Sequence, residues 1–307
     1  MKPVAVERAE HEKQKLQAEV IEHTRHNHQT NSSQDLITVV ITNYKPIDAE
    51  IEKHRMISSN SSSDRAIPFW KILQREPFLP PDVRKNERGM QGYENLSDSE
   101  LDDFYDDLEE IYRFTTETLA NWKDKVHKQH LNRYLLPFVL QNKILTANKD
   151  QWDYFLYVRN RHDVDPNMRI IAEEIQEAID SSEPRHVDFY SKFPHIPFIR
   201  EEERKDDDIE KLVLKSVARC ARVSYENHDK KIPTEEEDLD LAYMLVERDY
   251  YSERKQIQIN EDDPIHATPT EHQGSPATPD TRSGNFHSWH QFRKIIENID
   301  SLNNLEV

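Results

Sequence analysis

The sequence predicts a globular fold that mixes helices and strands, and two segments carry this prediction. Residues 97–126 place apolar side chains at three- and four-residue steps, which is the periodicity of an amphipathic helix. Residues 36–42, LITVVIT, are short and rich in β-branched side chains, which favours a buried strand. With 35% hydrophobic and 33% charged residues, the 307-residue chain has enough apolar content for a core beneath a very polar surface.

Composition argues against several classes of protein. No window approaches the roughly eighteen consecutive apolar residues that a membrane helix needs, and the amino terminus MKPVAVERAEHEKQKLQ is charged where a signal peptide is apolar. We therefore expect a cytoplasmic protein with no membrane partner. A net charge of −18 repels nucleic acid, so we expect no polynucleotide partner. A small anionic substrate would need local arginines to overcome that field.

The cysteine and histidine content predicts neither disulfides nor a metal site. Cys220 is the single cysteine and lies in the mostly apolar run LVLKSVARCARVSY, so we expect a small buried residue and not a nucleophile. His23, His26 and His28 have spacings that a metal could use. No carboxylate or cysteine framework accompanies them, so we interpret them as solvated side chains. They lie in residues 1–34, a polar stretch that we expect to form an exposed helix followed by a loop.

The clearest helix begins after the proline-rich connection REPFLPPDV. Ser97 and Glu100 form a capping-box signature. The apolar positions that follow are Leu101, Phe104, Leu108, Ile111, Leu119, Trp122 and Val126. We predict a core helix whose solvated face is DDFYDDLEE. A later helix is expected through the isoleucines at 170, 171, 175 and 179, and another begins near residue 209. Only four glycines are present, which argues against a glycine-rich phosphate loop.

Four arginines carry the first functional indication. Arg55, Arg65, Arg133 and Arg159 lie in separate segments, each beside apolar or small residues. A guanidinium group presents fixed, paired donors and stays charged, so it suits phosphate and pyrimidine carbonyl oxygens. Four of them could surround one nucleotide. On pattern alone, any single one of them is better explained as a surface or structural arginine.

The sequence segments around these arginines resemble the motifs of one enzyme family. KHRMISSNSSSDRAIP, residues 53–68, is similar to the Arg-His-Arg signature of the flavin-dependent thymidylate synthases, with Ser, Asn, Ser and Arg following at set intervals. HKQHLNRYLLPF resembles the helix that carries a substrate arginine in that family, and TANKDQWDYFLYVR resembles its flavin segment. ARCARVSY and HATPTEH are similar to the Ala-Arg-Val-Ser and His-x-Ser-Pro-x-Glu-His elements. The five matches cover the chain from about residue 18 to about residue 297.

The order of these elements differs from the common form of the family. There, the Ala-Arg-Val-Ser and Glu-His elements precede the Arg-His-Arg signature, whereas here they follow it. This order resembles a long, circularly permuted variant that is often encoded by phages or bacteria, which also shares GMQ and a terminal motif seen here as NFHSWHQFRK. A permutation is tolerated where the original termini lie close together on the surface.

The resemblance implies a fold and an activity. The fold is an α+β domain of the thymidylate-synthase-complementing-protein type, with long helices packed on a largely antiparallel sheet, here over residues 35–307 as one catalytic domain. The activity is reductive methylation of dUMP at C5, with FAD as cofactor and with methylenetetrahydrofolate and NADPH as co-substrates. The family also implies a homotetramer whose active sites combine several subunits, which would gather arginines of different chains in one cleft.

Residue roles transfer by motif. The resemblance makes Arg159 the catalytic residue, which promotes ionisation of the uracil at N3. The residues that it assigns to the nucleotide are Arg65, Arg133, Ser63 and Arg55. The residues that it assigns to the flavin are His54, Arg55, Asn60, Asn148 and His272.

Several positions depart from the family pattern. Lys53 replaces an arginine, Ser61 a glutamate and Tyr154 an asparagine, and Thr268 and Thr270 stand where Ser and an apolar residue are usual. In addition, Asp165 and Asn167 replace a glutamine and a glutamate. These changes leave two alternatives open. One is C5 alkylation or hydroxymethylation of another pyrimidine nucleotide, and the other is a catalytically silent nucleotide-binding homologue.

Overall fold

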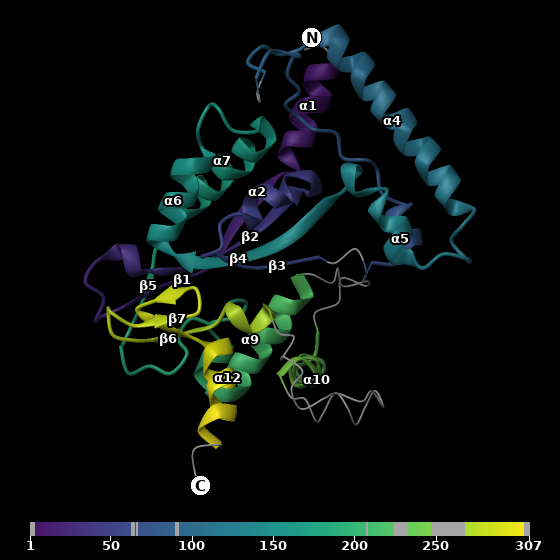
Figure 1. Ribbon diagram of the computed structural model, residues 1–307. Coiled ribbons are helices and arrows are strands. Elements are labelled where there is room, and N and C mark those ends of the chain that lie inside the picture. The colour runs from purple at the N-terminus through teal and green to yellow at the C-terminus, as the bar shows by residue number, and fades with distance from the viewer. Residues whose placement is uncertain are drawn as a thin grey trace.

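A five-stranded sheet lies between two layers in the computed structural model (Figure 1). The structure describes residues 4–62, 65, 67–89, 92–206, 208–223, 233–246 and 268–303. The strand order is β3-β4-β2-β1-β5, and every neighbouring pair is antiparallel except β1 and β5. The expected α+β class with a largely antiparallel sheet is therefore confirmed.

The elements are as follows. The sheet contains β1 (Gln17–His26), β2 (Leu36–Tyr44), β3 (Ser58–Ser61), β4 (Leu140–Asn148) and β5 (Arg185–Val187), and two small ladders pair β6 (Gly274–Pro276) with β9 (Trp289–Gln291) and β7 (Arg282–Ser283) with β8 (Phe286–His287). The α-helices are α1 (Val4–Gln14), α2 (Asp48–Glu52), α3 (Phe69–Ile72), α4 (Asp98–Ala120), α5 (Lys128–Arg133), α6 (Lys149–Arg159), α7 (Pro166–Asp180), α8 (Glu203–Asp206), α9 (Ile209–Val223), α10 (Glu235–Val246) and α12 (Phe292–Asn303). Short 3-10 turns are η1 (Ser32–Gln34), η2 (Lys45–Ile47), η3 (Leu136–Phe138) and η4 (Thr268–Glu271).

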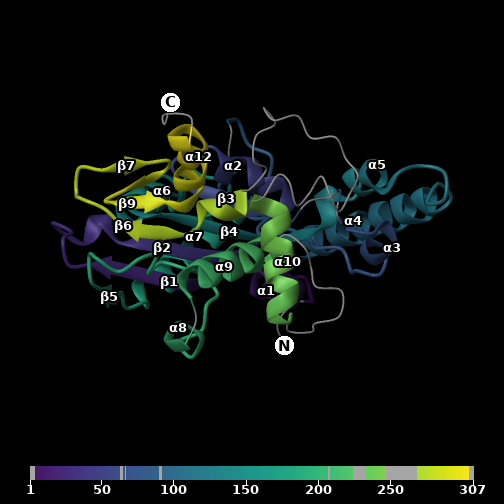
Figure 2. The ribbon, with the colours of Figure 1, turned by 90° about the horizontal axis from the view of Figure 1, so that it is seen from below.

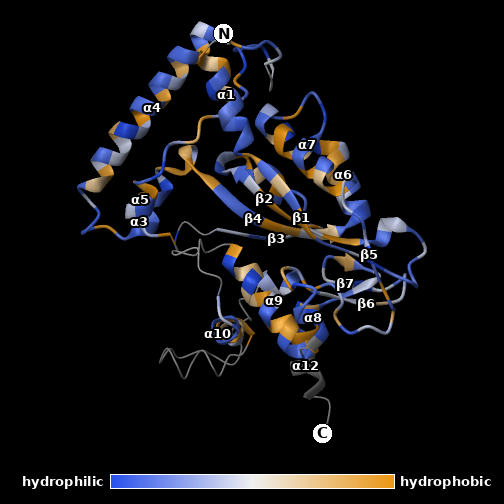
Figure 3. Ribbon diagram, turned by 180° about the vertical axis from the view of Figure 1, so that it is seen from behind, coloured by the Kyte–Doolittle hydropathy of each residue, from blue (hydrophilic) through white to orange (hydrophobic). Residues whose placement is uncertain are grey.

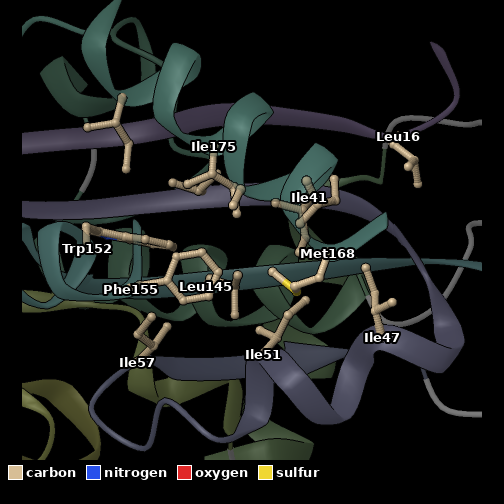
Figure 4. Packing of buried hydrophobic residues seen from close by; sticks show 14 of the residues in the cluster. Leu16, Ile41, Ile47, Ile51, Ile57, Leu145, Trp152, Phe155, Met168 and Ile175 are labelled. Carbon is tan, nitrogen blue, oxygen red and sulfur yellow. The ribbon is translucent and has the colours of Figure 1, made fainter. Parts of the chain in front are cut away.

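The apolar core lies on the face of the sheet that α2, α6 and α7 cover. Every second residue of β2 and β4 points to this face, because side chains alternate along a strand. Figure 4 shows Leu145 of β4 beside Trp152 and Phe155 of α6, with Met168 of α7 close by. The four isoleucines predicted for the helix that is now α7 are all buried, and the strand predicted over 36–42 is β2.

The opposite face of the sheet is buried but polar. It carries Thr24 of β1, Thr38 of β2 and Thr146 of β4, none of which is exposed. The helix α9, the turn η4 and the small ladders cover this face (Figure 2). The side chains that meet these threonines are histidines, because Thr38 Oγ1 lies 2.9 Å from His195 Nε2 and Thr146 Oγ1 lies 2.9 Å from His272 Nδ1.

One expectation for the first 34 residues was wrong. The helix is present as α1, but residues 17–26 form β1 in place of a loop, and β1 pairs with both β2 and β5. The polar character of this strand concealed it. Glu22 is buried because it forms ion pairs with Arg185 and Arg204, and these partners come from segments more than 160 positions away.

The helix predicted from residue 97 is α4, and its burial differs from the prediction. Ser97 and Glu100 form the complete capping box. The buried residues, however, are Tyr105 and Tyr112, whereas Phe104 and Ile111 are exposed. Each tyrosine can be buried because its hydroxyl donates to a backbone carbonyl: that of Pro80 at 3.0 Å for Tyr105, and that of Arg75 at 2.8 Å for Tyr112. Figure 3 shows apolar residues recurring along α4 at the edge of the molecule.

Among the described residues, no helix combines the length and the apolar character needed to cross a bilayer.

Candidate functional site

Arg159 ends α6 and is fixed by groups on the segment that contains α2. Its Nε donates to His54 Nε2 at 2.9 Å, and its Nη2 donates to the Glu50 carbonyl oxygen at 2.8 Å. Its Nη1 forms an ion pair with the Glu50 carboxylate. The guanidinium group is nearly buried, with 10% of the side chain exposed. Its position and orientation are therefore set before any ligand arrives.

The environment of Arg159, His54 and Glu50 favours a neutral His54 ring that accepts a hydrogen bond. Burial lowers the pKa of His54 to about 4, and the nearby Arg159 cation lowers it further. The imidazole is therefore neutral at pH 7, and Nε2 is the ring nitrogen that accepts from Arg159. A hydrogen bond from Lys53 lowers the pKa of Glu50, and the charge of Arg159 adds to this effect, so the carboxylate stays ionised.

Two pockets of about 250 Å³ each lie against His54 and Arg55. The first also contains Met56, Tyr154 and Arg159 in its wall, so it combines an aromatic ring, a thioether and cations. Glu52, Ser59 and Glu271 belong to the wall of the second. Each volume lies just below the roughly 300 to 1,000 Å³ range of ligand pockets, which suits a mononucleotide or one ring system better than a dinucleotide.

A larger pocket of about 860 Å³ lies between α1 and α4, far from this chemistry. Its wall contains Glu12, Glu76, Asp106, Glu109 and Glu110, with few basic groups beside them. Such a carboxylate-rich surface repels a phosphate. Size alone therefore does not identify the site, and the pockets at His54 are the better candidates for an anionic ligand.

The structure groups the predicted arginines in two pairs. Arg55 and Arg159 share the first pocket. Arg133 ends α5 and is exposed, and Asn132 beside it donates to the carbonyl oxygen of Ile67 at 2.9 Å, which places α5 next to the chain just beyond the exposed Arg65. α5 and α6 lie at opposite ends of the sheet in Figures 1 and 2. Within one chain, the two pairs are not brought together.

The residues predicted to contact a flavin have different environments. His54 and Arg55 face the pockets, as described above. Asn60 of β3 is half-buried, donates to the Cys220 carbonyl oxygen at 3.1 Å and accepts from Thr268 Oγ1 at 3.3 Å. Ser63, predicted near the phosphate, lies outside the described residues.

Asn148 and His272, which the family resemblance assigns to the flavin, are fully buried. Asn148 Nδ2 donates to the carbonyl oxygens of Gln34 and His287, and Oδ1 accepts from the His287 backbone N–H. His272 contacts Thr146, and burial lowers its pKa to about 3. Both side chains join the sheet to the layer below it. Neither side chain lines the two pockets at His54, and their assignment to the flavin stays a prediction.

The positions that depart from the family pattern have local explanations in two cases. Asp165 is the N-cap of α7 and accepts from the backbone N–H groups of Asn167 and Met168 at 2.9 and 3.0 Å. Asn167 exchanges two hydrogen bonds of 3.1 Å with the backbone of Asp82. Tyr154, in contrast, is 60% exposed at the first pocket, where it is available to a ligand.

Cys220 is buried, as predicted. Burial raises the pKa of its thiol, and the Nε2 atom of the Gln273 amide lies 3.5 Å from Sγ. A thiol that stays protonated inside a helix interface is a packing residue and not a nucleophile.

The sequence interpretation missed one residue of the site. Glu50 holds Arg159, and the signal that could have found it is its position in α2, four residues before His54. Outside the site, it also missed His195, which is buried against two threonines of the sheet and which no local motif marks.

Among the described residues, no group of three His, Cys, Asp or Glu side chains is placed to hold a metal ion. His23 contacts Asp35 and Ser182, whereas His26 contacts Ser288, so they act in separate hydrogen-bond networks. The interpretation of these histidines as solvated was wrong for His26, which is buried in this network, and holds only for the exposed His28.

Comparison with known proteins gave partial structural likenesses. No protein-family model and no curated protein matches the sequence. The UMP/dUMP methylase PolB from Streptomyces cacaoi, bound with 5-Br dUMP, is 15% identical with a TM-score of 0.43, over 53% of this chain and 89% of that chain. Thymidylate Synthase X (ThyX) from Helicobacter pylori, with FAD and dUMP, is 16% identical with a TM-score of 0.34, over 48% of this chain and 68% of that chain.

Proposed function

We propose that this chain is a flavin-dependent thymidylate synthase, an enzyme that methylates dUMP at C5 with methylenetetrahydrofolate as carbon donor, NADPH as reductant and FAD as cofactor. The observation that carries this proposal is the bond between Arg159 and His54, which lie 105 positions apart. They belong to two motifs that were matched to the family independently. Their meeting at one pocket is what a shared site requires.

The geometry of Arg159 suits stabilisation of an anionic pyrimidine. A guanidinium has five N–H groups, and three of them are used in the bonds to Glu50 and His54. The other two remain for a ligand in the pocket. Because the cation is held in place and largely shielded from water, it costs little reorganisation to stabilise charge that develops on the uracil ring.

The support for the expected flavin site differs among its residues. His54 and Arg55 line both pockets, whereas Asn148 and His272 are fully buried. A bound flavin supplies a hydride in a reaction of this type. The role of the chain's own residues is to orient the nucleotide and to favour its electron-rich form.

The remaining requirement is a phosphate site, and we assign it to Arg65 and Arg133 of a neighbouring subunit. Asn132, beside Arg133 in α5, bonds to Ile67, two positions after Arg65, whereas α6, which ends in Arg159, lies at the other end of the sheet (Figure 1). A homotetramer, as the family resemblance implies, would let the pair from one subunit complete the pocket of another. Arg55 would then face both the nucleotide and the flavin.

A second candidate is a catalytically silent nucleotide-binding homologue, which the burial of Asn148 and His272 favours. The alternative of a different pyrimidine substrate has less support than the silent homologue. The Asp165 substitution that motivated it caps α7 and therefore has a structural explanation.

The proposal is tested by the release of tritium from C5 of labelled dUMP, UMP and dCMP in the presence of FAD, NADPH and methylenetetrahydrofolate. We expect release from dUMP, and a loss of about 100-fold or more in Arg159→Gln, because removal of one preorganised donor typically costs that much. Arg161→Gln is the matched control, since Arg161 is exposed and pairs only with Asp163 among the described residues. Binding of dUMP without any release would favour the silent homologue, and preferential release from UMP or dCMP would identify another substrate.

A further inference from the structure

Lys143 of β4 is a fully buried lysine that faces α2. It lies two positions before Leu145, so its side chain points to the same apolar face of the sheet. Its Nζ forms an ion pair of 2.6 Å with Asp48 Oδ1 and a second ion pair with Glu52, which are the first and last residues of α2. Burial of an ammonium group is costly, so apolar packing does not explain a lysine at this position.

The two ion pairs fix the rotation of α2. This helix has five residues, and so short a helix has little stability of its own. Ile47 and Ile51 anchor the segment in the apolar core (Figure 4), which sets its distance from the sheet. Asp48 and Glu52 are four residues apart and therefore share one side of the helix. A single cation that holds both acids also sets the angle of α2 about its own axis.

The other side of the same helical turn holds Arg159. Successive residues of a helix are about 100° apart, so Glu50 lies about 200° around the axis from Asp48. Arg159 pairs with the Glu50 carboxylate and donates to the Glu50 carbonyl oxygen at 2.8 Å. It also donates to His54, two residues after the end of α2. The rotation that Lys143 imposes on α2 therefore determines where the partners of Arg159 lie.

Lys143 is the one side chain among the described residues that pairs with both acids of α2. Lys45 reaches Asp48 at 3.5 Å and Gln141 of β4 at 2.6 Å. Ser59 of β3 donates to Glu52 at 2.8 Å. Each of these holds one end of α2, through a long contact in the first case and a neutral hydroxyl in the second.

We propose that Lys143 is a positioning residue, which orients Arg159 for its ligand by tying both ends of α2 to the sheet. Its effect on catalysis rests on the function proposed above. Its effect on the contact between Arg159 and His54 does not, because that contact exists without a ligand.

The first test compares two lysine variants. Lys143→Met removes the cation at similar side-chain length. Lys15→Met is the matched control, because Lys15 pairs with the buried Glu12, and neither residue lines the pockets at His54. Urea midpoints should fall in both variants, since each leaves a carboxylate without its cation. Only Lys143→Met should also lower tritium release from dUMP, by about tenfold or more, because a small misplacement of a catalytic group can cost that much.

The second test separates positioning from stability. The triple variant Asp48→Asn/Glu52→Gln/Lys143→Met has no charge left in the cluster, so its urea midpoint should return towards that of the wild type. Its contact between Arg159 and His54 should still be weakened, and an NMR titration should show a His54 pKa above the wild-type value of about 4. The sign is diagnostic. The variant loses one positive and two negative charges, and this change alone would lower the pKa of a histidine.

Two results would overturn the assignment of Lys143. One is a triple variant with the His54 pKa of the wild type, because the ion pairs would then be dispensable for the site. The other is a folded Lys143→Met chain that releases tritium as fast as Lys15→Met. If Lys143→Met does not fold, the triple variant gives the decisive measurement. A wild-type chain that releases no tritium contradicts the proposed function instead, and the His54 titration then decides the role of Lys143.

Discussion

At the scale of single residues, the contact between Arg159 and His54 explains why an imidazole lies beside a guanidinium. A protonated His54 would place two cations 2.9 Å apart in a partly dry environment. Burial and the charge of Arg159 therefore keep His54 neutral, and the neutral ring offers Nε2 as an acceptor. The histidine orients the arginine, and the arginine fixes the protonation state of the histidine.

This coupling predicts that Arg159→Gln raises the pKa of His54 from about 4 towards the ordinary value near 6.5, because one of the two causes of the low pKa is removed. The other cause, burial, persists, so the pKa should stay below the ordinary value. The measurement is an NMR titration of the His54 ring in both proteins, with Arg161→Gln as control. An unchanged His54 pKa in Arg159→Gln would show that the two side chains do not interact as described.

The same residues show what could be predicted from the sequence. Three residues of the first pocket lie in sequence segments that match family motifs: His54, Arg55 and Arg159. Their convergence at this pocket was therefore predictable, although they come from different elements. Asn148 and His272 also lie in segments that match family motifs, yet both are buried. Asn148 bonds to Gln34 and His287, and His272 bonds to Thr146. Side-chain burial of this kind depends on packing between distant segments and has no local signal.

At the scale of elements, α7 shows how a departure from a family pattern acquires a local reason. Asp165 closes the first turn of this helix by accepting two backbone N–H bonds, and Pro166 starts the helix with a residue that lacks an N–H group. The four buried isoleucines of α7 then pack on the sheet. The position is explained by helix geometry, without reference to a cofactor.

We predict that Asp165→Ala lowers the free energy of unfolding by about 1 kcal/mol, the usual cost of losing an N-cap, and that Asp165→Asn restores most of it. Urea unfolding followed by circular dichroism measures both. Nucleotide affinity should be the same in the two variants and the wild type. Unchanged stability in Asp165→Ala together with altered nucleotide affinity would show that Asp165 contributes to nucleotide binding and not to the stability of α7.

The elements also divide into predictable and unpredictable ones for physical reasons. The strand at 36–42 and the helix at 170–179 have strong apolar periodicity and were found. The strand at 17–26 was missed because some of its buried residues, such as Glu22 and Thr24, are polar. Their burial is compensated by partners from distant segments, which are Arg185 and Arg204 for Glu22 and His195 for Thr24. The helix at 98–120 was found, but periodicity could not tell which part of its apolar arc faces its own chain.

At the scale of the whole molecule, the sheet joins an apolar layer on one face to a polar layer on the other. The polar contact includes His195, whose ring nitrogens lie 3.0 Å from Thr24 Oγ1 and 2.9 Å from Thr38 Oγ1, and His272 on Thr146. Burial lowers the pKa of both imidazoles, and Arg185 and Arg204 lower that of His195 further. Both rings are therefore neutral in the folded protein and must gain protons when it unfolds in acid.

The sign of the pH dependence follows. For a histidine whose pKa is lower in the folded state, the stabilisation is complete above the unfolded pKa of about 6.5 and is lost as pH falls towards the folded pKa, about 3 for His272. His272 alone should remove about 2 kcal/mol of stability between pH 7 and pH 5. Urea unfolding at the two pH values should show this loss in the wild type and a smaller loss in His272→Gln. Equal losses in both proteins would mean that His272 is already exposed or charged.

The central claim is that a pyrimidine nucleotide binds in the pocket that Arg159 and His54 share. Calorimetric titration of dUMP into the wild type, Arg159→Gln and Arg161→Gln tests it most directly. We predict saturable binding to the wild type and to Arg161→Gln, with affinity about tenfold or more weaker in Arg159→Gln, since a lost charge-assisted hydrogen bond costs about 1.5 to 3 kcal/mol. Absence of dUMP binding to the folded wild type, or equal affinity in all three proteins, would contradict the account.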